Sequence, residues 1–289
     1  MEHSAVLLID CPDRRGLVAR VSALLYQRGA NILHADQHRD RELGLFFMRV
    51  EWALGADPES EAGFDLDSFR RDFAPLAGEL EMHWTLTSTV HRPRMALFCS
   101  QYLHCMADLL ERWHTGELPC EIPLVVSNHR EVEKLAAFYG VPFEHVPVTP
   151  ATRFAAEARQ LELLAEREID FVVLARYMQI LSPAFVGRYP SAIINVHHSF
   201  LPAFVGARPY HAAHARGVKL IGATSHYVTE VLDDGPIIEQ DVARISHRDQ
   251  VEDLVARGRD LERIVLSRAV RWHLDRRILC YGNKTVVFD

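Results

Sequence analysis

Two hydrophobic patterns follow one another along the chain. Up to about residue 87, short apolar runs alternate with stretches of helical spacing. The spacing predicts strands at residues 6–9, 32–38, 45–51 and 81–86, and helices over residues 14–28 and 66–76. The resulting order, βαββαβ, predicts a small open sheet with two helices on one face.

The first predicted helix has recognisable ends. Asp13 is a residue type that caps helix N-termini, and Gly29 is a residue type that ends helices. Five apolar side chains share one helical face and are expected to be buried: Leu17, Val18, Val21, Leu24 and Leu25.

The second pattern begins after residues 88–94, a segment without periodicity that is typical of a linker. Strands then alternate with helices. We predict strands at residues 95–99, 122–126, 171–174, 192–196, 220–228 and 236–242, helices at 103–113, 132–138, 155–168 and 252–274, and a hairpin around Gly282. This alternation predicts a Rossmann-like, mostly parallel sheet with helices on both faces. The expected domains are residues 1–87 and 95–289.

Composition narrows the class of protein. The chain has 289 residues, of which 48% are hydrophobic and 25% charged, so it can bury a sizeable core. Its net charge of -7 argues against a nucleic-acid partner. No apolar run reaches the roughly 20 residues of a membrane helix, and no secretory signal is expected. Five cysteines without a C-x-x-C pair favour a reduced, cytoplasmic setting.

Polar residues of catalytic type follow two of the predicted strands. Asn195 and His197 stand at the end of the strand at 192–196, where open parallel sheets bind ligands. Asp233 lies in a turn-like segment between the strands at 220–228 and 236–242. An aspartate in a tight turn commonly caps its own backbone, so Asp233 taken alone is typical of a structural residue.

Taken together, these segments resemble a known family. Asn195-Val-His197-His-Ser-Phe-Leu-Pro202, residues 222–228 and residues 232–240 resemble the folate-dependent formyltransferase fold. Residues 202–210, 217–224 and 281–285 are similar to the 10-formyltetrahydrofolate deformylases within it. At the N-terminus, residues 10–21 and 28–32 resemble the start of an ACT domain.

The resemblance implies hydrolysis of 10-formyltetrahydrofolate to tetrahydrofolate and formate, which would supply formate for purine biosynthesis and balance one-carbon folate pools. Asn195 and His197 would stabilise the oxyanion, and Asp233 would activate water. We expect shielding from solvent to raise the proton affinity of Asp233. No metal or other cofactor is expected to be required.

Folate recognition is also implied by the resemblance. Residues 176–182 are similar to the segment whose backbone holds the pterin in this family. The expected substrate-binding residues are Gln179, Ile180, Leu181, His226, Thr229 and Leu232. The alternative is that Met178, Ile180 and Leu181 are core residues, and both interpretations are compatible because backbone contacts leave side chains free to pack.

Two other functions stay open on the sequence. One is a formyltransferase with a small amine acceptor, and the other is a non-catalytic folate-binding regulator. The related glycinamide ribonucleotide formyltransferases carry a glycine-rich, phosphate-binding loop after the first strand, whereas residues 99–105 contain no glycine. This difference favours water as the acceptor, and the presence of Asn195, His197 and Asp233 favours an enzyme.

Three further expectations concern ligands and assembly. The ACT resemblance implies a small amino acid near Gly16, with a pure assembly module as the alternative. An open sheet edge predicts an even-numbered homo-oligomer. His104 and Cys105 are expected to point apart as helical neighbours, and His211 with His214 lacks a third ligand, so no metal site is predicted.

Overall fold

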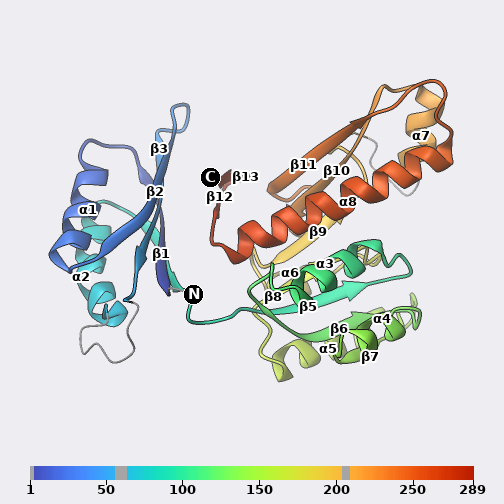
Figure 1. The fold of residues 1–289 in the computed structure, drawn as a ribbon, viewed down its shortest axis with the longest axis horizontal. Helices are drawn as coiled ribbons and strands as arrows, with labels where there is room; N and C mark the ends of the chain where they lie inside the picture. The colour runs from blue at the N-terminus through green and yellow to red at the C-terminus, as the bar shows by residue number, and fades with distance from the viewer. Residues whose placement is uncertain (1–2, 56–63, 204–208) are drawn as a thin grey trace. The chain divides into compact units, whose positions relative to one another are not determined.

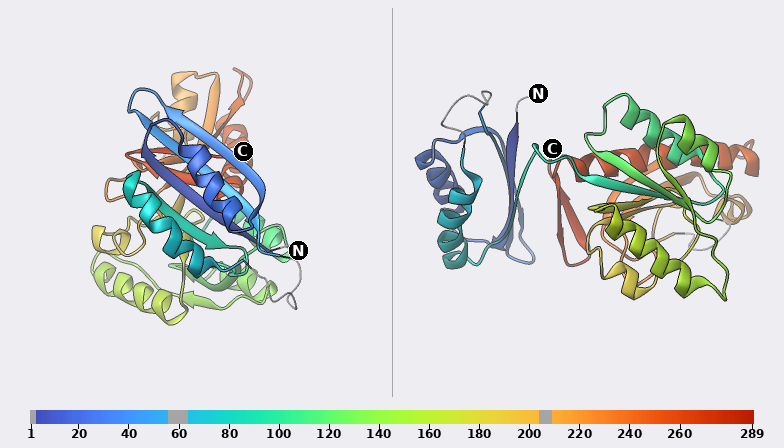
Figure 2. Two further views of the ribbon diagram at one scale, coloured as in Figure 1. Left: turned by 90° about the vertical axis from the view of Figure 1, so that its left-hand side faces the viewer. Right: turned by 90° about the horizontal axis from the view of Figure 1, so that it is seen from below.

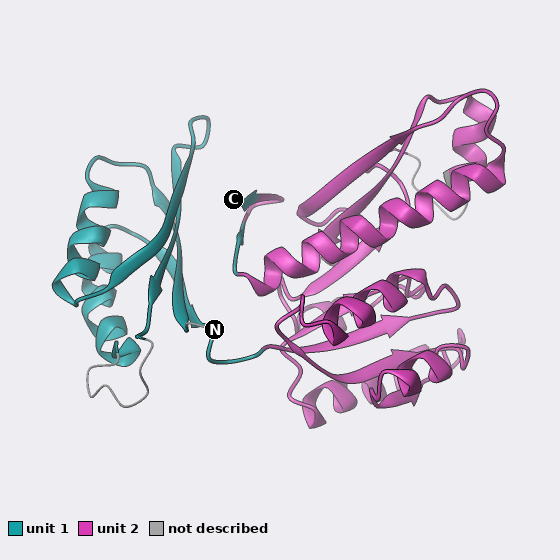
Figure 3. Ribbon diagram, in the orientation of Figure 1, with its two compact units in different colours: residues 1–92, 276–279, 286–289 teal, residues 93–275, 280–285 magenta. Residues whose placement is uncertain are grey.

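The computed structural model describes residues 3–55, 64–203 and 209–289 and divides the chain into two compact units (Figure 3). The first unit comprises residues 1–92 together with 276–279 and 286–289. The second comprises residues 93–275 and 280–285. The sequence prediction had placed both tail segments in the second domain.

The first unit has the predicted βαββαβ order. Its elements are β1 (Ser4–Pro12), α1 (Leu17–Gln27), β2 (Asn31–Asp40), β3 (Leu45–Ala53), α2 (Leu66–Glu79) and β4 (His83–Ser88). The strands form an antiparallel sheet in the order β2-β3-β1-β4. Figure 1 shows α1 and α2 on the same face of this sheet, so the predicted arrangement is confirmed.

The ends of α1 show one correct and one wrong expectation. Gly29 has a φ of 74°, and its amide bonds Tyr26 O while that of Ala30 bonds Leu25 O, which is a Schellman ending. Asp13 does not cap the helix. Its amide bonds Gly44 O, and the N-cap position is taken by Gly16 in a left-handed conformation.

The core of the first unit lies between the sheet and the two helices. Leu17, Val21 and Leu25 are buried on α1, and aromatic residues of α2 and β3 pack around them. Val18 is 40% exposed, so its predicted burial was wrong. The helical face is narrower than expected because residues at i and i+1 diverge by about 100° around the helix axis.

The second unit is a seven-stranded sheet in the order β11-β10-β9-β8-β5-β6-β7. Its strands are β5 (Arg94–Cys99), β6 (Glu121–Ser127), β7 (Phe143–His145), β8 (Phe171–Leu174), β9 (Ile193–His197), β10 (Leu220–Tyr227) and β11 (Ile237–Arg244). Strands β5 to β9 pair in parallel, whereas β10 runs antiparallel to both of its neighbours, β9 and β11. The sheet is therefore mostly parallel, as predicted.

Helices cover both faces of this sheet (Figure 2). They are α3 (His104–His114), α4 (Glu133–Phe138), α5 (Arg153–Glu166), α6 (Pro183–Val186), α7 (Pro209–Arg216) and α8 (Val251–Leu274). The apolar side of α8 packs against β9, β10 and β11. The chain ends in the predicted hairpin, formed by β12 (Ile278–Tyr281) and β13 (Lys284–Val287) around Gly282. No helix among the described residues is long and apolar enough to cross a membrane.

The strand order places the loops that follow β5, β8 and β9 at one edge of the sheet. The chain proceeds outward from β5 to β6 and β7, and then returns to the other side of β5 as β8 and β9. This reversal is a topological switch point, where loops on either side diverge and leave room for a ligand.

Candidate active site

A cavity of about 390 Å³ opens at this edge of the sheet, beside the switch point. It is lined by the loop after β8, the end of β9, the end of β10 and the loop after β10. All the predicted catalytic and folate-binding residues line it: Asn195, His197, Asp233, Gln179, Ile180, Leu181, His226, Thr229 and Leu232. Part of the sequence motif at 202–210 lies outside the described residues.

Asp233 is held in an unusual backbone conformation. Its φ is 55°, in the left-handed region that side-chain-bearing residues seldom adopt. Two residues later, a Cβ on Gly235 would lie only 1.7 Å from the carbonyl oxygen of Tyr227. Only glycine therefore lets the loop pass so close to β10, and this close passage fixes the position of Asp233.

The carboxylate of Asp233 lies between two histidines. Oδ2 is 3.2 Å from Nδ1 of His197, and Oδ1 is 3.7 Å from Nε2 of His226. Nδ1 of His226 donates to the carbonyl of Tyr227 at 2.9 Å, which orients the ring. The side chain of Asp233 is 13% exposed, so a small part of it still faces solvent.

These neighbours decide the charge of Asp233. Burial raises its pKa, but the interactions with His197 and His226 outweigh burial and hold the pKa well below the ordinary value. The expectation of a raised proton affinity was therefore wrong. Asp233 is a carboxylate at neutral pH.

Asn195 and His226 are brought together by strand pairing. They are direct partners in the antiparallel ladder of β9 and β10, where opposite side chains lie on the same face. Nδ2 of Asn195 is 3.2 Å from Nε2 of His226. His197 stands two residues further along β9 on that face, and its Nε2 is buried without a hydrogen-bond partner among the described residues. Asn195 and His197 thus present nitrogen atoms at the cavity.

The segment after β8 is held from behind by residues that the sequence analysis did not single out. Ser100 accepts from the amide of Met178 at 3.0 Å, Arg153 donates to Ile180 O at 2.9 Å, and Glu157 accepts from the amide of Ser182 at 2.9 Å. Gln160 donates to the hydroxyl of Tyr177 at 2.8 Å. The spacing of three and four along α5 could have indicated this shared face.

The alternative interpretation, that Met178, Ile180 and Leu181 are core residues, is correct for one of the three. Leu181 is buried with the second unit's core, whereas Met178 and Ile180 are 49% and 55% exposed. Both exposed side chains line the cavity. They therefore provide an apolar wall for a flat ring.

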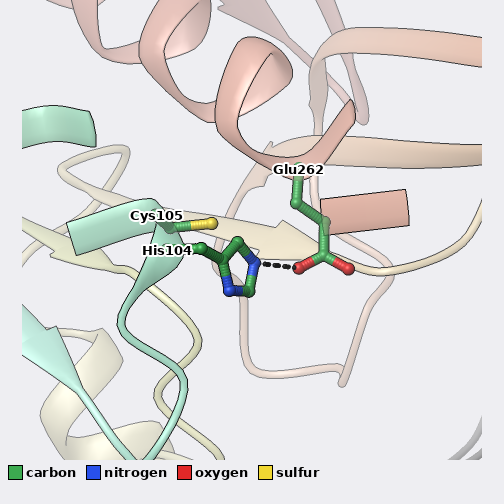
Figure 4. Close-up of side chains that lie close together, drawn as sticks. All are labelled: His104, Cys105 and Glu262. Atoms are coloured by element: carbon green, nitrogen blue, oxygen red, sulfur yellow. Dashed lines mark hydrogen bonds and ion pairs between the residues drawn. The ribbon is translucent and has the colours of Figure 1, made fainter. Parts of the chain in front are cut away.

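A second buried carboxylate, Glu262, lies against Arg176 of the cavity lining, and Figure 4 shows it beside His104 and Cys105. Glu262, on α8, is 2.7 Å from Nε2 of His104 and accepts from the hydroxyl of Tyr210 at 2.7 Å. Nε of Arg176 is 3.4 Å from the same carboxylate. We call these four residues the Glu262 cluster. Burial raises the pKa of Glu262, but His104, Arg176 and Tyr210 bring it below the ordinary value.

His104 and Cys105 do not diverge as expected. A nitrogen of His104, the sulfur of Cys105 and an oxygen of Glu262 all lie within 4.8 Å of one another, because α8 brings Glu262 against the first turn of α3. Burial and the nearby Glu262 raise the pKa of the Cys105 thiol well above its ordinary value. The Arg176 cation, 3.4 Å from Glu262, opposes a second cation such as a metal ion at this place.

Comparison with known proteins agrees with this geometry. The Formyl transferase family model matches residues 93–270, and the ACT domain model matches residues 5–51. The formyltetrahydrofolate deformylase of Synechocystis sp. is 51% identical, covering 99% of this chain and 98% of that protein. The chain belongs to the formyltetrahydrofolate deformylase family.

Solved structures of the family confirm the fold. A formyltetrahydrofolate deformylase from Pseudomonas syringae has a TM-score of 0.95 and 50% identity, covering 100% of this chain and 95% of that one. A glycinamide ribonucleotide transformylase from Symbiobacterium toebii has a TM-score of 0.65 and 30% identity, covering 69% of this chain and 95% of that one. The deformylase family thus accounts for both units, whereas the transformylase matches a smaller part of the chain.

Proposed function

We propose that the enzyme hydrolyses 10-formyltetrahydrofolate to tetrahydrofolate and formate in the cytoplasm. The observation that carries this proposal is the cavity beside the switch point, where Asn195, His197 and Asp233 meet. Full-length similarity to formyltetrahydrofolate deformylases supports the same reaction. The formate released would serve purine biosynthesis, and the reaction would balance the one-carbon folate pools.

The two walls of the cavity support an orientation for the substrate. The backbone of residues 179–181 would bind the edge of the pterin, with Ile180 and Leu181 against its face. His226, Thr229 and Leu232 line the opposite side. The formyl group would then lie at the ends of β9 and β10, beside Asn195 and His197.

The chemistry follows from the charges at that end. As water attacks the formyl carbon, Nδ2 of Asn195 and a protonated Nε2 of His197 donate to the developing oxyanion. The Asp233 carboxylate binds the attacking water and also accepts from Nδ1 of His197. When the bond between carbon and N10 breaks, one water proton goes to N10 and the other leaves, giving formate. Because the pKa of Asp233 is low, we assign its main role to orienting water rather than to holding the proton.

The decisive experiment is incubation with 10-formyltetrahydrofolate alone, in the presence of a chelator and without any amine. We expect stoichiometric formate and tetrahydrofolate, since no metal or other cofactor enters the proposed reaction. Loss of the formyl group only after an amine is added would establish a formyltransferase instead. Folate binding without turnover would establish a regulator.

The first unit supports a proposal of assembly. Strand β2 is an edge strand of ten residues, and most of its side chains are exposed. Pairing of such an edge with a second copy satisfies backbone groups that otherwise face water. We expect an even-numbered homo-oligomer, and a monomeric mass in light scattering would contradict it.

The ACT match also suggests a small amino acid as effector near Gly16. Gly16 has a φ of 88° at the start of α1, and a Cβ built there meets no atom within 4 Å, so the turn is open. The first unit's cavity of about 490 Å³ lies instead at the other end of α1, around Arg28 and Gly29. Calorimetry with the common amino acids separates an effector site from an assembly module, because only the former gives a binding signal.

A further inference from the structure

The proposed reaction creates a new anion inside the cavity. Formate is a carboxylate, and two carboxylates, Asp233 and Glu230, already line the walls. Among the described residues that line this cavity, Arg176 is the only lysine or arginine. Arg176 begins the segment that is similar to the pterin-binding segment of the family. It has no role in the proposed hydrolysis itself.

Arg176 is buried in a way that is costly for a cation. Its side chain is 9% exposed, and its Nε makes no hydrogen bond to a described residue. Its backbone has a φ of 63°, which is unfavourable for any residue with a Cβ. The amide of Ser100 donates to its carbonyl at 3.2 Å and helps to hold this conformation. A buried charge in a constrained backbone is typical of a functional position.

The Glu262 cluster explains how the cation is tolerated. Glu262 is 1% exposed and lies 3.4 Å from Nε of Arg176, a distance that supplies a counter-charge without a hydrogen bond. Hydrogen bonds from His104 and Tyr210 fix the carboxylate in place. The ring of Tyr102 lies 5.1 Å from the guanidinium carbon on another side. The guanidinium therefore keeps donors that no acceptor among the described residues uses.

His198 shows on which side of the site the cation lies. Its ring is 5.0 Å from that of His197, centre to centre. Burial first, and then the charges of Arg176 and His197, lower the pKa of His198 to about 4. Arg176 thus acts on the neighbour of the catalytic histidine, at the formyl end of the cavity. His198 is uncharged at neutral pH and does not compete with Arg176 for an anion.

We propose that Arg176 binds the carboxylate of the formate product, and that Glu262 is a positioning residue that holds the guanidinium at the cavity wall. The inference rests on the proposed function and adds a product subsite to it. A guanidinium matches a carboxylate with two parallel N–H donors, which suits a planar anion such as formate. Partial neutralisation by Glu262 keeps this affinity moderate, so that the product leaves.

The test measures formate binding directly, by titrating ¹³C-formate into the full-length enzyme and following its NMR line width. Arg176→Gln should weaken formate binding about 10- to 100-fold, the usual worth of charge-assisted hydrogen bonds. Arg176→Lys keeps the positive charge but loses the two parallel N–H donors of the guanidinium, and should weaken formate binding severalfold. If the Arg176→Gln variant does not fold, the formate affinity of the Arg176→Lys variant tests the proposal instead.

Glu262→Gln gives the opposite expectation. Glutamine keeps an oxygen acceptor but removes the negative charge, so the guanidinium attracts anions more strongly. Formate should bind severalfold more tightly than to the wild type, and product inhibition should increase. A purely structural role of Glu262 would not tighten formate binding. Arg112→Gln is the matched control, since Arg112 pairs with Asp108 and Glu117 on α3, and formate affinity should not change.

The glutamyl tail of the folate is the other carboxylate that could reach Arg176. If it does, Arg176→Gln raises KM for 10-formyltetrahydrofolate but not for 10-formyltetrahydropteroate, which lacks the tail, and formate binding is unchanged. That outcome overturns the proposal, as does unchanged formate binding in both Arg176 variants. Because binding is measured without turnover, a wild type that binds formate through Arg176 but does not hydrolyse the substrate would refute the proposed function alone.

Discussion

Asp233 and Glu262 are two carboxylates with similar neighbours, but only Asp233 lines the cavity. Asp233 and Glu262 are both shielded from solvent, and both have a pKa below the ordinary value because histidines and other donors face them. Asp233 lines the cavity beside His197, whose Nε2 has no hydrogen-bond partner in the described part of the chain. Glu262 is 1% exposed, and three side chains surround its oxygens.

This contrast shows that a lowered pKa does not by itself mark a catalytic group. The two sites differ in whether hydrogen-bonding groups remain free next to the cavity. Beside Asp233, Nε2 of His197 bonds to no described residue, whereas His104 and Tyr210 both bond to the carboxylate of Glu262. The first site is built for a ligand, and the second is built to support Arg176.

The largest expected effect is on turnover. Asp233→Asn should lower kcat by about 10²–10⁴-fold, because an amide cannot bind the attacking water as a carboxylate does. Folate binding should persist, since the side chain keeps its size. Asp234→Asn is the matched control and should keep most activity. Two active variants with normal folate affinity would remove Asp233 from the mechanism.

Glu262→Ala should instead act on stability. Removing one partner of a buried ion pair typically costs about 3–5 kcal/mol, because Arg176 is left without its counter-charge. Hydrogen exchange of the α8 amides would measure the loss. Glu166→Ala, which removes an exposed pair with Arg159, should cost less than about 1 kcal/mol. Equal exchange in the two variants would contradict the difference in burial.

Tyr210→Phe should cost less than Glu262→Ala, since it removes a single donor. A hydrogen bond to a buried charge is worth about 1.5–3 kcal/mol. Tyr139→Phe is a close control, because Tyr139 donates to Glu111 at the same distance of 2.7 Å on an exposed surface. The same exchange measurement should show little change for it. If both variants lost equal stability, burial of the Glu262 cluster would not matter.

The smallest expected effect is on the free energy of unfolding at acid pH. It concerns His198, which lies between the two sites. Its pKa is lowered to about 4 in the folded protein, compared with about 6.5 when unfolded. The unfolded chain therefore binds a proton first, and stability falls as pH drops from 6.5 to 4, by about 1–3 kcal/mol. His198→Gln should lose this part of the pH dependence of unfolding. An unchanged slope would place the titration elsewhere.

Much of the architecture followed from periodicity. The strand at 171–174 was predicted with its observed ends, since a continuous apolar run between turn signals is typical of a buried parallel strand. The helix at 252–274 was placed within one residue. Short elements such as β7 and α6 were missed, because three or four residues show no periodicity.

The site was predicted in part. Asn195 and His197 stand at the end of a predicted strand, but the resemblance to the formyltransferase family is what indicated Asn195, His197 and Asp233 together, since Asp233 taken alone is typical of a structural residue. The sign of the Asp233 pKa shift could not be predicted, because it depends on β9 pairing with β10 and bringing His226 near. The Glu262 cluster was not predicted at all. His104 and Glu262 are 158 positions apart, and no local pattern links them.

The two tail segments of the first unit bear on the order in which the protein is made. The carbonyl of Arg276 accepts from Nε of Arg49 at 3.0 Å, and Phe288 is 1% exposed. Residues 1–92 are translated before residues 93–275, yet these contacts are supplied by residues 276–279 and 286–289, which are translated after them. The first unit is therefore completed only after residues 93–275 of the second unit have been made, and removal of residues 276–289 would take away part of the first unit.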